Sequence, residues 1–159
     1  MAVHKQKWSI GDVFVIPTED GKHVVGQLIG REAEVLNSVT VALFDERVDR
    51  PEDAARAELP ESKVFSVLFA TRDLLDSGDW RVVTNRPVEI PRRWFPSEDK
   101  RASGFVGAKV IGSGIINEFV NAYFCLVPWD DWKDPNYLDN LLLSPEKKPK
   151  NVILKSTMS

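Results

Sequence analysis

The sequence contains one cysteine, Cys125, so an internal disulfide is excluded. Its two histidines, His4 and His23, leave little material for a histidine-based metal cluster or a serine–histidine–aspartate relay. No apolar run approaches the roughly 20 residues that span a bilayer, and residues 1–10 lack the apolar core of a signal peptide. These absences predict a soluble protein with a cytoplasmic location and no membrane partner.

An excess of positive charge is also absent. The chain has 21 Lys and Arg against 24 Asp and Glu, a net charge of −3, which argues against a nucleic-acid partner. The charge is distributed unevenly, because residues 45–79 are acidic overall and residues 80–112 are basic overall. Such a pair of segments can steer a charged partner, although solvated loops explain the same pattern.

The length of 159 residues and the 43% hydrophobic content fit one domain over residues 1–159. Apolar residues on both sides of Asp20-Gly21 predict an antiparallel hairpin over residues 13–30. Helical spacing of apolar residues predicts a helix near 114–125, and Asp134-Pro135 predicts the start of a second helix over 135–143.

The predicted fold class is therefore α+β. We expect a strongly bent antiparallel sheet or a partly open β-barrel, with the two C-terminal helices packed on it. Residues 8–96 would form a β-rich core, residues 97–143 would add a strand and the two helices, and residues 144–159 would form a tail.

Candidate groups for chemistry are few. Cys125 lies beside the apolar face of the predicted helix, where a buried thiol is a better interpretation than a nucleophile. Asp130, Asp131 and Asp134 could supply oxygen ligands to a divalent cation, but they lack the glycine turn of a calcium loop, and Asp134 is also explained as a helix cap. We therefore expect no catalytic residues, no metal and no other cofactor, with these three carboxylates as the alternative metal ligands.

Two stretches, GDVFVIPTEDGKHVVGQLIG and VFSVLFATRDLLDSGDWRVVTNRPVEIPRRWFP, together resemble the immunity protein 26 family of bacterial polymorphic toxin systems. The resemblance covers residues 8–96, and the sequence departs from it at His23 and Gln27. The residues that carry the signature are interpreted as structural: Gly11, Asp12, Phe14, Pro17, Asp20, Gly21, Gly26 and Trp80.

The resemblance implies an immunity protein that binds a cognate toxin, encoded by a neighbouring gene, and neutralises it by protein–protein contact. A toxin that acts on nucleic acid carries a basic cleft, which an acidic segment could fill. The predicted toxin-binding residues come from the acidic segment and are Asp45, Glu46, Asp49, Glu52, Asp53 and Glu58.

An enzymatic alternative comes from residues 121–143, which resemble an extension in a branch of the family whose name also carries a small phosphotriesterase. That resemblance implies metal-assisted hydrolysis of organophosphate esters. The available ligands would be His23 with the three carboxylates of residues 130–134, a thin set for making a metal-bound hydroxide. A β-barrel scaffold that binds a regulatory partner is the third interpretation.

Overall fold

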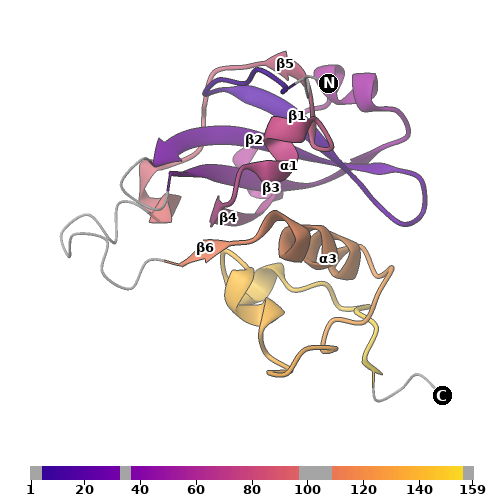
Figure 1. Ribbon diagram of the computed structural model, residues 1–159. Helices are drawn as coiled ribbons and strands as arrows, with labels where there is room; N and C mark the ends of the chain where they lie inside the picture. Colours follow the sequence, from indigo (N-terminus) through magenta and orange to yellow (C-terminus); the bar gives the residue numbers. More distant parts are fainter. Residues whose placement is uncertain (1–4, 33–36, 97–108, 156–159) are drawn as a thin grey trace.

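The computed structural model describes residues 5–32, 37–96 and 109–155 (Figure 1). In this part of the chain, six strands form one mixed sheet in the order β5-β1-β2-β3-β4-β6. The strands are β1 (Asp12–Pro17), β2 (His23–Glu32), β3 (Ser38–Val48), β4 (Val64–Ala70), β5 (Arg81–Asn85) and β6 (Val110–Ile111). Neighbouring strands are antiparallel, except that β6 runs parallel to β4.

The predicted hairpin is confirmed, because β1 and β2 pair from Val13–Gln27 to Pro17–His23. Its turn is closed by a hydrogen bond of 2.9 Å from the Thr18 N–H to the Lys22 carbonyl, and Gly21 there has a φ of +82°. Glycine suits this left-handed position because it has no Cβ.

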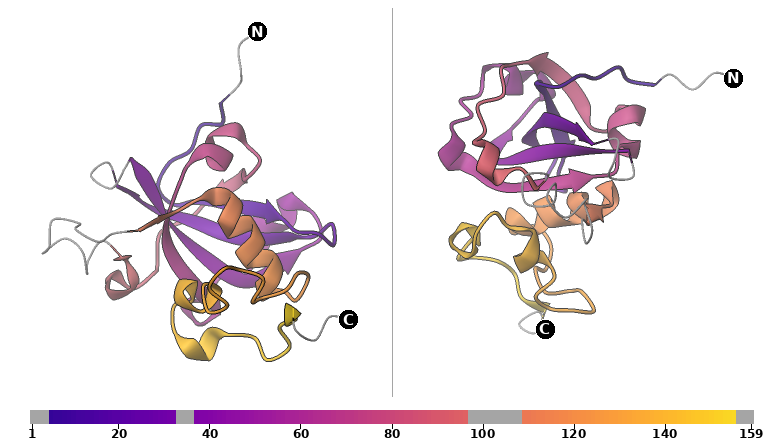
Figure 2. Two further views of the ribbon diagram at one scale, coloured as in Figure 1. Left: turned by 60° about the horizontal axis from the view of Figure 1, so that its bottom comes forward. Right: turned by 90° about the vertical axis from the view of Figure 1, so that its left-hand side faces the viewer.

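The predicted bend of the sheet is confirmed as well. The pairing of β2 with β3 shifts register between Val24 and Gly26 and again between Leu28 and Gly30, and β1–β5 and β3–β4 each shift once. Such irregularities increase the local twist of a sheet. The sheet therefore curls strongly without closing into a barrel (Figure 2).

The two faces of the sheet are covered by different segments. On one face, Phe14 and Leu28 pack in a core cluster with Ile116 and Phe119 of helix α3 (Ser113–Tyr123), which lies beneath the sheet in Figure 1. On the other face, Val13, Val15 and Val25 pack with Ala54. Because successive strand residues point to opposite faces, β1 contributes to both cores, and the α+β class is confirmed.

The remaining helical segments are short. They are α1 (Asp73–Ser77) and the 3₁₀ helices η1 (Pro51–Arg56), η2 (Glu61–Lys63), η3 (Arg92–Trp94), η5 (Leu138–Leu141) and η6 (Pro145–Lys147). No helix in the described ranges is both long enough and apolar enough to cross a membrane.

The predicted second C-terminal helix over 135–143 is wrong in type and length, because the structure forms only η5 there. Tertiary hydrogen bonds use the backbone groups that would extend the helix. The Leu141 carbonyl accepts the Ser66 hydroxyl of β4, and the Leu143 N–H donates to the Phe65 carbonyl at 2.8 Å. These bonds hold the segment against β4 in a tighter and shorter turn.

Candidate functional site

The connection between β3 and β4, together with the last residues of β3, carries all six predicted toxin-binding residues. We call residues 45–61 the acidic excursion, because they include seven acidic and three basic side chains. Its helix η1 is fixed by the fully buried Ala54 and by Arg86, whose guanidinium donates to the carbonyls of Ala54, Ala55 and Ala57 at 3.3, 2.5 and 2.6 Å. A positive charge is favourable at this carbonyl end of a helix. The acidic excursion is therefore ordered against the end of β5.

Three of the six predicted residues gather around Lys63. Glu46 forms an ion pair with the Lys63 ammonium, and the charges of Asp45 and Glu58 attract the same ammonium. The hydrogen bond that the Lys63 ammonium donates to Glu46 is the largest cause of a raised Lys63 pKa, and the charges of Asp45 and Glu58 raise it further. Asp45 also interacts with Tyr123 of α3. The pKa of the Tyr123 hydroxyl is raised mainly by the burial of this side chain, and the Asp45 carboxylate raises it further.

The other three predicted residues lie at the start of η1. Asp49 is 4.0 Å from the Lys22 ammonium, and both side chains are largely exposed. Asp53 accepts the Arg50 N–H at 3.2 Å and so caps η1, whereas Glu52 is exposed. In the structure the six predicted residues thus form two groups, one around Lys63 and one at the start of η1.

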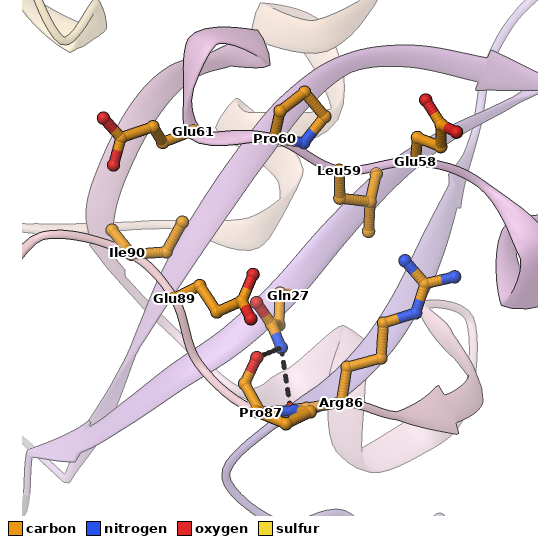
Figure 3. A pocket seen from close by; sticks show the side chains of 9 residues that line it. All are labelled: Gln27, Glu58, Leu59, Pro60, Glu61, Arg86, Pro87, Glu89 and Ile90. Carbon is orange, nitrogen blue, oxygen red and sulfur yellow. Dashed lines mark hydrogen bonds between the residues drawn. The ribbon is translucent and has the colours of Figure 1, made fainter.

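A pocket of about 370 Å³ opens between the acidic excursion and the segment that follows β5 (Figure 3). The lining residues are Gln27, Glu58, Leu59, Pro60, Glu61, Arg86, Pro87, Glu89 and Ile90. The pocket has three glutamates, Glu58, Glu61 and Glu89, and the sequence predicted only Glu58 as a binding residue. Glu89 was missed because it belongs to a segment that is basic overall, and only the folded chain places it opposite Glu58 and Glu61.

The wall of the pocket is positioned by two buried residues, Gln27 in β2 and Gly11 just before β1. The Gln27 side-chain amide donates to the carbonyls of Gly11 and Arg86 at 3.1 and 3.0 Å, and it lies 3.4 Å from that of Pro87. Gly11 has a φ of +97°, and a Cβ there would lie 2.7 Å from the Arg86 carbonyl oxygen. Any larger residue at position 11 would push residues 86 and 87 away from this position.

The other residues of the sequence signature make contacts within the fold. Asp12 accepts the Ser9 N–H at 2.8 Å and the Asn85 side-chain amide at 3.0 Å. In the hairpin turn, the Thr18 hydroxyl lowers the pKa of Asp20 most, and the Lys22 N–H and the Arg47 charge lower it further. These contacts tie the N-terminal segment to β5 and the hairpin turn to β3.

Each of the alternative metal ligands has a partner within the fold. Asp130 accepts the Lys155 N–H at 2.7 Å, Asp131 pairs with the Lys155 ammonium at 2.9 Å, and Asp134 accepts the N–H of Asn136 at 2.9 Å. Across residues 5–32, 37–96 and 109–155, no group of three or more His, Cys, Asp or Glu side chains is placed to hold a metal ion. Cys125 is half-buried.

Comparison with known protein families gave a match. A family model described as Immunity protein 26 matches residues 9–106, which is more than half of the chain and includes the hairpin, the acidic excursion and the pocket. No curated protein and no solved structure matches the chain. Helix α3 and the C-terminal segment lie beyond the matched residues.

Proposed function

The chain belongs to the immunity protein 26 family, and from this premise we propose that it binds a cognate toxin protein and neutralises it by direct contact. The toxin would be the product of a neighbouring gene. Neutralisation by contact requires the immunity protein to cover the surface that the toxin uses, and it requires no cofactor.

The observation that carries the proposal beyond the family is the charge of the acidic excursion. A toxin that cuts or modifies nucleic acid needs a basic cleft to hold phosphates. The acidic excursion offers the opposite charge, with Glu52 and Glu58 exposed and seven acidic side chains in total against three basic ones. Complementary charge raises the association rate and selects the partner.

The order of the acidic excursion also supports the proposal. Ala54 is buried against the sheet, and the Arg86 guanidinium donates to the carbonyls of Ala54, Ala55 and Ala57 at the C-terminal end of η1. A segment that is ordered before binding loses less conformational freedom when the complex forms. The acidic excursion is therefore suited to enter a cleft as a preformed body.

The test is to express the chain with the product of its neighbouring gene and to purify one through a tag on the other. We expect a stable complex, and we expect the toxic activity to fall as the immunity protein is added up to one equivalent. The matched control is a toxin from an unrelated gene pair, which should be neither bound nor inhibited. A neighbouring gene product that is neither bound nor inhibited would contradict the proposal.

A further inference from the structure

We propose that the pocket beneath the acidic excursion receives one lysine or arginine side chain of the partner protein. The inference rests on the proposed function, because it identifies a contact by which the toxin would be held. It concerns the pocket lined by Gln27, Glu58, Leu59, Pro60, Glu61, Arg86, Pro87, Glu89 and Ile90 (Figure 3).

The walls of the pocket suit the hydrocarbon part of a long basic side chain. Leu59 and Pro60 come from the acidic excursion, and Pro87 and Ile90 come from the segment after β5. Lysine and arginine bury their methylene groups along apolar surface while the charged end reaches polar groups. With a volume of about 370 Å³, the pocket has room for one such side chain.

The charges at the pocket favour a cation. Glu58, Glu61 and Glu89 carry three negative charges. None of their carboxylates forms a hydrogen bond or ion pair with another residue in the described ranges, although the charge of Glu58 acts on the Lys63 ammonium. The one positive lining group, the Arg86 guanidinium, is held by backbone carbonyls of residues 54–57. A cation that enters the pocket would meet this excess of negative charge.

Gln27 supplies an independent indication of the same ligand. Gln27 is only 5% exposed, and its amide nitrogen donates to the backbone carbonyls of Gly11, Arg86 and Pro87. Its side-chain oxygen has no hydrogen-bond partner within the described ranges, and Gln27 is one of the side chains that line the pocket (Figure 3). The Gln27 side-chain oxygen can accept a hydrogen bond from an N–H of an ammonium or guanidinium group in the pocket.

Other occupants fit less well. An anion would meet three carboxylates and an acceptor oxygen, and an apolar side chain would cover these groups without satisfying them. No group of three acidic side chains in the described part of the chain is placed to bind a metal ion, so a divalent cation does not explain the pocket. A monovalent side-chain cation with an apolar stem matches both the walls and the charges.

The first experiment tests the pocket without the toxin. We would titrate N-acetyl-arginine amide and N-acetyl-lysine amide into the full chain and follow the Gln27 side-chain amide and the Ile90 methyl groups by NMR. N-acetyl-norleucine amide, which has a similar stem and no charge, is the matched control probe. Saturable shifts of both groups with either basic probe, and none with norleucine, are expected. Equal shifts with norleucine, or no shifts with the basic probes, would overturn the inference.

Two variants complete this experiment. E58Q/E61Q/E89Q removes the three pocket charges while keeping the side-chain shapes, and it should lose the shifts caused by the basic probes. E19Q/D79N/E118Q removes three charges from exposed side chains that do not line the pocket. This control variant should still show the shifts caused by the basic probes. A pocket variant that binds the probes as well as the parent chain does would also overturn the inference.

The second experiment uses the toxin complex. The pocket variant should dissociate at least about tenfold faster than the parent chain, because pairing of desolvated charges controls dissociation. The control variant should change the dissociation rate less than about twofold. Equal dissociation rates for the two variants would overturn the inference. If the parent chain binds no toxin, the proposed function fails, and the small probes still decide whether the pocket takes a basic side chain.

Discussion

The rings of Phe14 and Trp80 are stacked in the core, with centroids 5.3 Å apart and planes inclined by only 8°. Gly26 on β2 lies beside Phe14, and the Trp80 indole donates a hydrogen bond of 2.9 Å to Asn117 on α3. One contact chain thus joins β2, β1, the start of β5 and the helix. The sizes of three signature residues, Phe14, Gly26 and Trp80, are therefore matched to one another in the core.

Substitution of Gly26 by Ala should destabilise the protein. The added Cβ would lie 2.7 Å from the Phe14 ring, which is itself fixed by Trp80, so the core is overpacked. We expect the free energy of unfolding, measured by urea denaturation, to fall by about 1–3 kcal/mol.

The control for this prediction is G114A, in the first turn of α3, where an added Cβ would meet no atom within 4 Å. This variant should be as stable as the parent chain or more stable by up to about 1 kcal/mol, because alanine favours helix. If G26A unfolds at the same urea concentration as G114A, the close approach to Phe14 does not matter for stability.

The hairpin and the bent sheet could be predicted because their signals are local. Asp20-Gly21 specifies the turn, and Gly26 and Gly30 lie at the two register shifts of β2 against β3. The 3₁₀ form of η5 could not be predicted, since it depends on hydrogen bonds to Phe65 and Ser66, more than seventy residues earlier.

The pocket could not be predicted for the same reason. Gln27, Glu58 and Glu89 come from three segments that are far apart in the sequence, and only the fold brings them to one place. The charge pattern assigned Glu58 and Glu89 to segments of opposite overall sign. A count of charges along the chain therefore assigns residues that line the same pocket to segments of opposite charge.

Replacement of Arg86 by Lys should loosen the acidic excursion without unfolding the sheet. Lysine keeps the charge but lacks the planar fork that donates to the carbonyls of Ala54, Ala55 and Ala57. Hydrogen–deuterium exchange of the Ala57 amide, which donates to Ala54, should become about tenfold faster, corresponding to the loss of roughly one hydrogen bond.

R81K serves as the control, since Arg81 is exposed on β5 near Arg86 in the sequence. Its exchange rates over residues 51–61 should match those of the parent chain. Unchanged exchange in R86K would show that Ala54 alone holds the acidic excursion in place.

Reversal of charge at the start of η1 should slow toxin binding. In D49K/E52K/D53K, the complementary field is removed, so the association rate should fall by at least about tenfold at low salt. The difference should shrink as salt is raised, because exposed charges are screened. Stopped-flow association at several salt concentrations measures this effect.

E19K/D79K/E118K carries the same change of charge on exposed residues outside the acidic excursion and should slow association less. Because Asp53 caps η1, circular dichroism and thermal melting of the triple variant must match the parent chain before its rates are compared. An association rate equal to that of the control variant would remove residues 49–53 from the interface.

Stability should depend on pH through Asp73. Its carboxylate accepts hydroxyl hydrogen bonds from Ser113 at 2.6 Å and Thr71 at 2.7 Å, and these two bonds, in that order, lower its pKa from the usual 3.8. A lowered pKa in the folded state means that the stabilisation is present above the unfolded pKa and is lost as the pH falls through the folded pKa. D73N should therefore be less stable than the parent chain at pH 7, and the difference should shrink as the pH falls below the usual value of 3.8 and through the lowered folded-state pKa.

The expected pH profile has a control in S113A. Removing this hydroxyl takes away the largest cause of the lowered pKa, so D73N should cost less in the S113A background than in the parent chain. Urea denaturation from pH 7 to pH 3 for the four proteins of this cycle measures the coupling. A cost of D73N that is the same at pH 7 and pH 3 would contradict the prediction.

The segment beyond the family match should be required for the stability of the sheet itself. Leu138 of η5 is fully buried in the same cluster as Phe14 and Phe65, and Tyr123 stacks on Phe65 with centroids 3.7 Å apart. L138A should therefore lower the free energy of unfolding by about 2–5 kcal/mol, because it leaves a cavity in a core that the sheet shares. I10A, at a side chain that is 46% exposed, should change it by less than about 0.5 kcal/mol. Urea denaturation followed by tryptophan fluorescence and by far-UV circular dichroism should give one shared transition for L138A. Two separate transitions, or a stability equal to that of I10A, would mean that the C-terminal segment folds apart from the sheet.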